Sequence, residues 1–213
     1  MRTNLLRRFI NLVFPPHADV RAAEYVEETA LFDVFMLSRL VGSRVYIALP
    51  YRDRNVRVLV RANKFHGDRH AAQLLGAALA EMLMSLAEEY ALAAHARSPL
   101  LVPVPASPKR LRERGENQVE RIIGALPEEV RRYYDIETRA LKRRHRESQV
   151  RVPYASRHTN VRGAFYVYEA RRVSGRSVIL VDDVIESGAT MKDAMRALRE
   201  AGAQDVIGVA LAK

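Results

Sequence analysis

The stretch Ser177-Val-Ile-Leu-Val-Asp182-Asp183-Val-Ile-Glu186-Ser187-Gly188-Ala189-Thr190 decides the fold. Its four consecutive apolar residues before the two acids predict a short strand covered on both faces, as in a parallel sheet. Beyond Thr190, apolar residues recur every three or four positions as far as Ala201, which indicates an amphipathic helix. A strand, a turn and a helix therefore meet over residues 182–190, and the predicted fold class is α/β.

The turn in this stretch favours an anionic ligand. In open α/β sheets ligands bind at the carboxyl ends of the strands. Backbone N–H groups of a Gly/Ser/Thr-rich turn that opens a helix point toward an anion. We therefore expect a phosphate group at residues 186–190, with a hydroxylated group beside it.

A second segment repeats this layout. A strand is predicted over residues 99–105, followed by a basic loop over 106–118 and a helix over 119–126. Two such units imply parallel strands with right-handed crossovers. The other expected elements are a helix within 20–43, strands at 45–49, 160–167 and 205–211, a helix over 56–65 capped by Asn55, and a helix over 71–94. The charged residues 139–149 are expected to be mobile.

Composition limits the possible partners. The 213 residues include 48% hydrophobic residues, and the net charge of +10 favours anionic partners. The sequence contains no cysteine, so disulfides and thiolate metal sites are excluded, and its six histidines show no paired metal-ligand spacing. The apolar part of residues 1–14 is too short for a signal peptide or a membrane span, so we expect a cytoplasmic protein.

The opening stretch resembles the phosphoribosyl pyrophosphate signature of type I phosphoribosyltransferases. Over residues 46–213 the chain also resembles the ComF-like family within them. The matching segments are Lys64–Gly67, Val102 through Lys109–Gly115 to Asn117-Gln118, Ser148-Gln149, Arg157, Asn160–Phe165 and the signature itself. Two departures are a missing cysteine zinc ribbon after Phe14-Pro15-Pro16 and Glu116 in place of a usual aromatic residue. Residues 1–45 are interpreted as an N-terminal helical appendage, and 46–213 as the phosphoribosyltransferase-like domain.

The resemblance implies a type I phosphoribosyltransferase-like fold with a small hood. It also implies Mg²⁺-dependent displacement of pyrophosphate from C1 of phosphoribosyl pyrophosphate by a nitrogen nucleophile, or the reverse. Asp182 and Asp183 would accept from the ribose hydroxyls and hold Mg²⁺ weakly. The 5′-phosphate would lie on Ser187, Gly188, Ala189 and Thr190. Pyrophosphate would lie on Lys109, Arg110, Arg112 and Arg114, and a flexible loop with Arg143, Arg144, Ser148 and Gln149 would cover the site.

Several alternatives stay open at this level. Glu186 is either a general acid or base or simply an acid at a helix N-terminus. The cations of residues 109–114 either bind pyrophosphate or form a solvated basic face. The protein is either an active enzyme on an unidentified acceptor or a non-catalytic nucleotide sensor. In the second case its basic surface would bind DNA in uptake or processing. A homodimer is possible.

Overall fold

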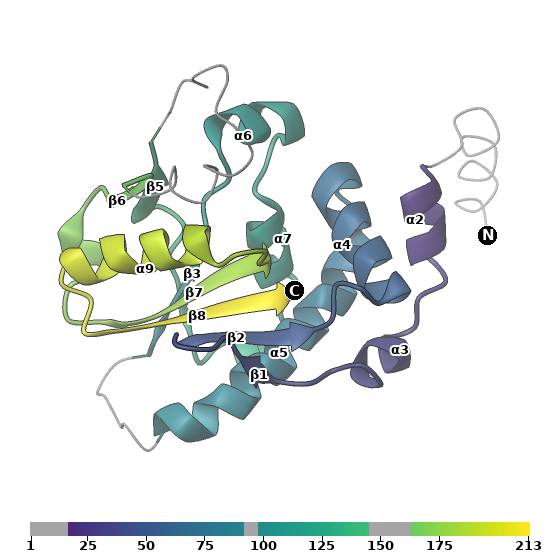
Figure 1. Cartoon of the computed structure of the whole chain (residues 1–213), viewed down its shortest axis with the longest axis horizontal. Helices are drawn as coiled ribbons and strands as arrows, with labels where there is room; N and C mark the ends of the chain where they lie inside the picture. Colours follow the sequence, from purple (N-terminus) through teal and green to yellow (C-terminus); the bar gives the residue numbers. More distant parts are fainter. Residues whose placement is uncertain (1–16, 92–97, 145–162) are drawn as a thin grey trace.

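The computed structural model describes residues 17–91, 98–144 and 163–213, and its centre is a twisted sheet (Figure 1). The strand order is β1-β2-β8-β7-β3-β4. The strands are β1 (Ser38–Arg39), β2 (Val45–Leu49), β3 (Leu100–Pro103), β4 (Asp135–Ile136), β7 (Ser177–Val184) and β8 (Asp205–Ala212). Neighbouring strands are parallel except for β1 and β2. A separate antiparallel pair consists of β5 (Leu141–Arg143) and β6 (Phe165–Val167).

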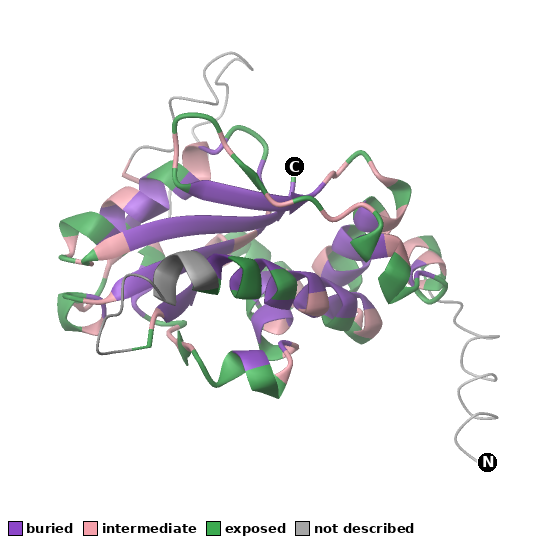
Figure 2. Ribbon diagram, turned by 90° about the horizontal axis from the view of Figure 1, so that it is seen from below, coloured by how far each residue is buried: buried purple, intermediate pink, exposed green. Residues whose placement is uncertain are grey.

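Helices cover both faces of the main sheet. They are α2 (Ala18–Ala23), α3 (Glu28–Phe32), α4 (Arg54–His66), α5 (Arg69–Ala91), α6 (Pro108–Arg114), α7 (Gln118–Gly124), α8 (Glu128–Arg131) and α9 (Ala189–Glu200), with a 3-10 turn at Ala170–Arg172. Along β7, Ile179 and Val181 join the core formed by α4, α5 and α7, whereas Val178 and Leu180 join the core under α9. Figure 2 shows the strands as buried ribbons between the helical layers. The predicted α/β class, with a mainly parallel sheet flanked by helices, is confirmed.

The register of β3 and β7 positions the candidate site. Leu100 pairs with Val178 and Pro103 with Val181, so both strands end at the same edge. Past the end of β3, Val104 N–H donates to the Val181 carbonyl over 2.8 Å. The chain leaving β3 and the acidic end of β7 therefore lie side by side, as the two repeated units predicted.

The basic segment after β3 differs from its prediction as a loop, because most of it is the helix α6. Ser107 caps this helix by accepting from Arg110 N–H, Pro108 occupies its first turn, and Gly115 ends it at φ 81°. No residue of α6 is buried, and even Leu111 is 45% exposed. Since α6 has no apolar face, hydrophobic periodicity gave no sign of it.

Three other expectations need correction. The helix predicted within 20–43 is interrupted, because α3 ends at Phe32 and Ser38–Arg39 form the edge strand β1. The cap of α4 is Asp53, whose carboxylate accepts from the N–H groups of Asn55 and Val56. Residues 141–143 were expected to be mobile, but they form β5 and bury Leu141. The rest of that segment, from residue 145, lies outside the described residues.

The segment from Ala23 to Leu31 packs on the body of the protein. Ala23, Val26 and Leu31 are buried in the same core as α4 and α5. The boundary expected at residue 46 falls inside β2, and the two-part division stays a prediction.

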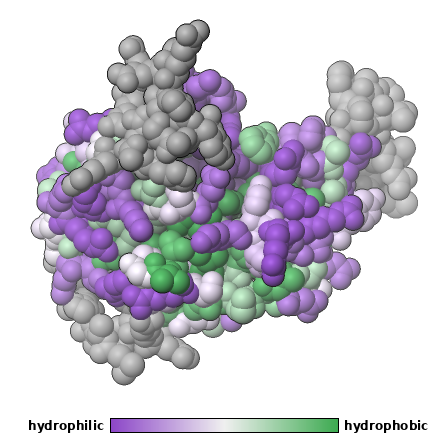
Figure 3. All heavy atoms as spheres, in the orientation of Figure 1, coloured by the Kyte–Doolittle hydropathy of each residue, from purple (hydrophilic) through white to green (hydrophobic). Residues whose placement is uncertain are grey.

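Helix α5 has an apolar composition that its position explains. Its segment Arg69–Ala87 has a mean hydropathy of 1.2 and is long enough to cross a membrane, but 61% of it is buried within the protein. Buried core helices often have this length and hydropathy, so this composition is weak evidence for a membrane span. Figure 3 shows hydrophilic side chains at both sides of one molecular face, with apolar residues gathered over the central strands.

Candidate active site

A cavity of about 310 Å³ opens at the carboxyl ends of β3 and β7. It is lined by Lys64, Val104, Pro105, Ala106, Arg110, Gln118, Arg143, Asp182, Asp183, Val184, Ile185, Glu186, Ser187, Gly188, Ala189 and Thr190. The structure therefore brings together the predicted phosphate loop, both aspartates, Glu186 and two of the predicted cations. The parallel register of β3 and β7 places the segments that follow these strands at one edge, whereas Lys64 comes from α4 and Arg143 from β5.

The loop between β7 and α9 has the geometry of an anion site. Ile185 N–H donates to the Ala212 carbonyl over 2.9 Å, which fixes the loop to the end of β8. Gly188 adopts φ 79° and precedes the twelve-residue helix α9, whose first N–H groups have no carbonyl partner within the helix. A Cβ atom on Gly188 would lie 3.1 Å from Leu40 Cδ2. The absence of a side chain at Gly188 therefore lets Leu40, which follows β1, pack closely against the loop.

Asp182 and Asp183 occupy the end of β7 below this loop. Asp183 N–H donates to Asp182 Oδ1 and Val184 N–H donates to Asp183 Oδ1, each over 2.9 Å. Burial, followed by the neighbouring Asp183 carboxylate, raises the pKa of Asp182 well above its ordinary value. Two adjacent carboxylates that resist joint ionisation favour a ligand that supplies hydroxyl donors or a hard cation. This donor set fits ribose hydroxyls and one Mg²⁺ ion.

Lys64 and Gln118 are site residues to which sequence reasoning assigned no role. Lys64 Nζ lies 3.7 Å from Asp183 Oδ2, and Gln118 Nε2 donates to the same oxygen over 3.4 Å. The side chain of Lys64 is 22% exposed and that of Asp183 is 4% exposed, so this ion pair is largely removed from water. Both residues stand in segments that resemble the ComF-like family, but no spacing rule places residue 64 beside residue 183.

Several cations lie in or beside the cavity. Arg110 and Arg143 line it directly. Arg114 hydrogen-bonds Gln118 Oε1 over 3.2 Å and lies 5.0 Å above the Phe65 ring. Burial, followed by the charge of Arg110, lowers the pKa values of both Arg114 and Arg143. Cations that repel one another in this way are stabilised by a multiply charged anion.

Other predicted site residues lie elsewhere or outside the described residues. The side chain of Lys109 is 80% exposed, pairs with Glu113 at 3.9 Å and does not line the cavity. Arg112 does not line the cavity. Arg144 lies 5.0 Å above the Tyr166 ring. Ser148 and Gln149 fall in residues that the structure does not describe.

The two glutamates singled out in the sequence have different surroundings. Glu186 is exposed at the rim of the cavity, next to the phosphate loop. Glu116 lies outside the cavity, where it forms an ion pair with Arg121. Arg121 in turn donates to the backbone and side-chain oxygens of Asn63 over 2.7 and 2.8 Å. Glu116 thus helps to join α7 to α4, which accounts for an acidic residue at that position.

The β5–β6 pair carries Arg143 and is held by a single carboxylate on α9. Gly163 N–H and Phe165 N–H donate to the two oxygens of Asp193 over 2.8 and 3.1 Å. Burial alone would raise the pKa of Asp193, but the hydrogen bonds from Gly163, Arg196 and Phe165 hold it below its ordinary value. Arg143 also lies 5.4 Å above the Phe165 ring. Asp193 therefore positions Arg143 from outside the cavity.

A second cavity of about 340 Å³ adjoins the first and shares Lys64 and Gln118 with it. Its other lining residues are Phe65, His66, Gly67, Glu113, Arg114, Glu116 and Arg121. The Lys64–Asp183 ion pair therefore lies at the junction of two hollows.

Comparison with known proteins finds a similar domain in the C-terminal part of the chain. Residues 132–213 match the family model for a phosphoribosyl transferase domain, a range that includes β7, its acidic end and the phosphate loop. A ribose-phosphate pyrophosphokinase of Sulfurisphaera tokodaii is 55% identical over 40 residues, which are 19% of this chain and 14% of that protein.

Solved structures also show likenesses. A hypoxanthine phosphoribosyl transferase of Trypanosoma cruzi is 13% identical, with 65% of each chain covered and a TM-score of 0.42. An allosteric regulatory enzyme of purine biosynthesis is 19% identical over 71% of this chain and 30% of that chain, with a TM-score of 0.39. The chain spans less than two thirds of the length of each of these three proteins. The match to the phosphoribosyl transferase domain model covers residues 132–213, which is less than half of the chain.

Proposed function

We propose that the protein is a Mg²⁺-dependent phosphoribosyltransferase of the ComF type, acting between phosphoribosyl pyrophosphate and a nitrogenous acceptor. The observation that supports this most strongly is the set of residues that line one cavity. The phosphate loop, the two aspartates and the arginines Arg110 and Arg143 all line it. A ligand with a single phosphate would need either the loop or the arginines, whereas phosphoribosyl pyrophosphate carries a separate anionic group for each.

Each group of the substrate has a counterpart in this arrangement. The 5′-phosphate would accept hydrogen bonds from the N–H groups of residues 187–190 and from the Ser187 and Thr190 hydroxyls. The ribose hydroxyls would donate to Asp182 and Asp183. The pyrophosphate would lie against Arg110 and Arg143, which stabilise the negative charge that grows on it as the C1–O bond breaks. Bound Mg²⁺ would neutralise part of that charge.

The proton released by the acceptor needs a base. As the bond from C1 to the acceptor nitrogen forms and the C1–O bond to pyrophosphate breaks, a proton leaves that nitrogen. Among the described residues that line the cavity, Glu186 is the one carboxylate besides the aspartate pair. We propose Glu186 as the general base. Its exposure leaves it accessible to a planar acceptor bound at the cavity mouth.

The test begins with binding, because the acceptor is unidentified. Isothermal titration of the full-length protein with phosphoribosyl pyrophosphate, with and without Mg²⁺, should show Mg²⁺-dependent binding. Asp183→Asn should weaken that binding at least tenfold, and Glu129→Gln, at an exposed acid outside the cavity, controls for the loss of one negative charge on the protein. Absence of binding by the wild-type protein would overturn the proposal. A screen of nucleobases for pyrophosphate release then tests Glu186→Gln, which should retain binding and lose turnover.

A second candidate function is a nucleotide sensor with a basic DNA-binding surface. The observation that favours it is a further cavity lined by four cationic side chains, Arg39, Arg44, Lys192 and Arg199. DNA binding through such residues should weaken steeply with salt. A gel-shift series at increasing salt concentration tests this function, and binding that is absent or insensitive to salt counts against it.

A further inference from the structure

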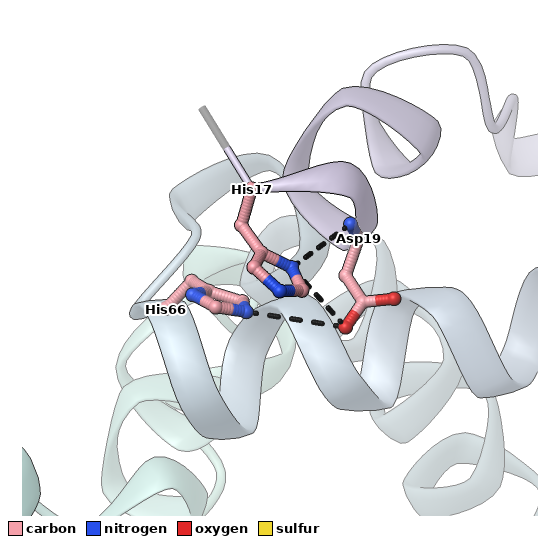
Figure 4. A group of neighbouring side chains, drawn as sticks. All are labelled: His17, Asp19 and His66. Atoms are coloured by element: carbon pink, nitrogen blue, oxygen red, sulfur yellow. Dashed lines mark hydrogen bonds and ion pairs between the residues drawn. The ribbon is translucent and has the colours of Figure 1, made fainter. Parts of the chain in front are cut away.

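Three metal-ligating side chains from two distant segments meet on the outer side of α4 (Figure 4). His17 caps α2 and Asp19 lies in its first turn, whereas His66 is the last residue of α4. Asp19 Oδ2 lies 3.5 Å from His17 Nδ1 and 3.9 Å from His66 Nε2. All three candidate ligand atoms lie within 4.8 Å of one another. Figure 4 shows both imidazole rings beside the carboxylate of Asp19.

The donor types suit a borderline transition ion rather than Mg²⁺. Two imidazole nitrogens and one carboxylate oxygen are typical zinc ligands, and a water completes a tetrahedron. Ligand atoms around tetrahedral zinc are separated by roughly 3.3 Å when each bond is about 2.0–2.1 Å. The present separations need side-chain shifts of about 1 Å or less, which exposed side chains can make by small rotations. The side chains of His17, Asp19 and His66 are 54%, 17% and 26% exposed, so an ion and its water have access from solvent.

Two existing contacts must be compatible with a bound ion. Asp19 N–H donates to His17 Nδ1 over 3.2 Å, an exposed hydrogen bond that a metal bond would replace. Arg61 Nε donates to Asp19 Oδ2 over 3.0 Å. Because the carboxylate has two oxygens and rotates about a broad two-fold torsion, one oxygen can bind the metal while the other accepts from Arg61. Arg61 would then orient the Asp19 carboxylate that binds the metal.

We propose that His17, Asp19 and His66 bind one zinc ion that joins the start of α2 to the end of α4. The two imidazole rings are stacked with their centroids 4.2 Å apart, so the rings must turn for their in-plane nitrogen lone pairs to point at one shared ion. The same end of α4 carries Lys64, two residues before His66, which reaches Asp183 in the candidate active site. A zinc ion here would therefore restrain the helix end that supplies Lys64, without contacting the substrate cavity.

Zinc content tests this proposal independently of any activity. The full-length protein must carry no polyhistidine tag, since a tag would itself bind zinc. We expect one zinc per chain after exposure to zinc and dialysis, measured by mass spectrometry of the metal. His17→Ala and His66→Ala should each lower the affinity at least tenfold in a competition titration with a chromophoric chelator. At zinc concentrations about 100-fold above Kd, the thermal midpoint of the wild-type protein should rise by about 5–10 °C.

Matched variants separate this site from non-specific binding. His70→Ala removes a histidine whose Nε2 lies 3.2 Å from the Val26 carbonyl, away from the cluster, and it should leave zinc binding unchanged. Asp19→Asn retains the shape of the side chain and an acceptor for Arg61, so it should fold normally and still lose affinity. Absence of stoichiometric zinc overturns the proposal. Equal zinc binding by the wild-type protein and the His17→Ala and His66→Ala variants, or equal loss in His70→Ala, overturns it as well.

Discussion

Replacing Lys64 by methionine tests whether the buried ion pair controls the charge of the aspartate pair. Lys64 Nζ and Asp183 Oδ2 are 3.7 Å apart. At that separation the Coulomb energy is about 4 kcal/mol for an effective dielectric constant of about 20. Because Lys64 keeps about a fifth of its side chain in water, we halve this value to about 2 kcal/mol. The unliganded variant should therefore unfold about 4–8 °C below the wild-type protein.

The same substitution should also change how binding depends on pH. The positive charge of Lys64 opposes the burial and the Asp183 charge that raise the pKa of Asp182. Its removal should raise the pKa of Asp182 further, so more of this carboxyl is protonated near pH 7. A ligand complex with Mg²⁺ requires the ionised form. We expect the affinity of Lys64→Met for phosphoribosyl pyrophosphate to be weaker than wild type at pH 6.5 and to recover toward it at pH 8.5.

Differential scanning calorimetry and isothermal titration at these two pH values measure both effects. Lys213→Met, at an exposed residue outside both cavities, controls for the loss of one positive charge. A thermal midpoint within about 1 °C of wild type would show that the ion pair contributes little. An equal loss of affinity at both pH values would show that Lys64 contacts the ligand directly, and would refute its role as a counter-ion to the aspartates.

Three further substitutions test other parts of the site. Asp182→Asn removes a carboxyl whose raised pKa makes the folded state less stable as the pH rises above the ordinary pKa of an aspartate. Calorimetry should therefore show a higher thermal midpoint for the variant at pH 7, and this gain should vanish near pH 4. Titration should show weaker binding of phosphoribosyl pyrophosphate. Asp193→Asn should lower the free energy of unfolding, measured in urea at pH 7, by about 2 kcal/mol. The lowered pKa of Asp193 stabilises the folded state at pH values above the pKa of this group in the unfolded chain, and this contribution is lost as the pH falls. The stabilities of the variant and the wild type should therefore converge in acid. Gly188→Ala places a Cβ atom on a left-handed backbone, 3.1 Å from Leu40. The substitution should cost about 1–2 kcal/mol of stability and weaken phosphate binding measured by titration. Unchanged binding would contradict the proposed role of this loop.

Local pattern was sufficient for the centre of the fold. The apolar run before Asp182 predicted β7, and the helical period after Thr190 predicted α9. The strand predicted over residues 99–105 corresponds to β3, which the structure places at Leu100–Pro103. β3 and β7 are buried on both faces and α9 on one face, so burial leaves its pattern in the sequence. Once β7 and α9 are located, the positions of the aspartates at the end of β7 and of the phosphate loop before α9 are also known.

Elements without an apolar face, and contacts between distant segments, could not be read in this way. Helix α6 is held by its caps rather than by burial, so its charged residues looked like a loop. Lys64 meets Asp183, and His17 meets His66, only because the helices pack on the sheet in this order. The sequence grouped Lys109 with Arg114 as cations of one segment and favoured Arg114, which lies beside Gly115. The structure shows that Lys109 pairs with Glu113, whereas Arg114 donates to Gln118.

The packing of Leu40 against Gly188 has a consequence for any shortened form of the protein. Leu40 follows the edge strand β1, whereas Gly188 belongs to the loop proposed to hold the 5′-phosphate. A protein that began at residue 46 would lose this leucine, the edge strand and the first residue of β2 together. The loop would then be bare on one side, so a fragment with every proposed ligand-binding residue intact should still bind phosphate poorly.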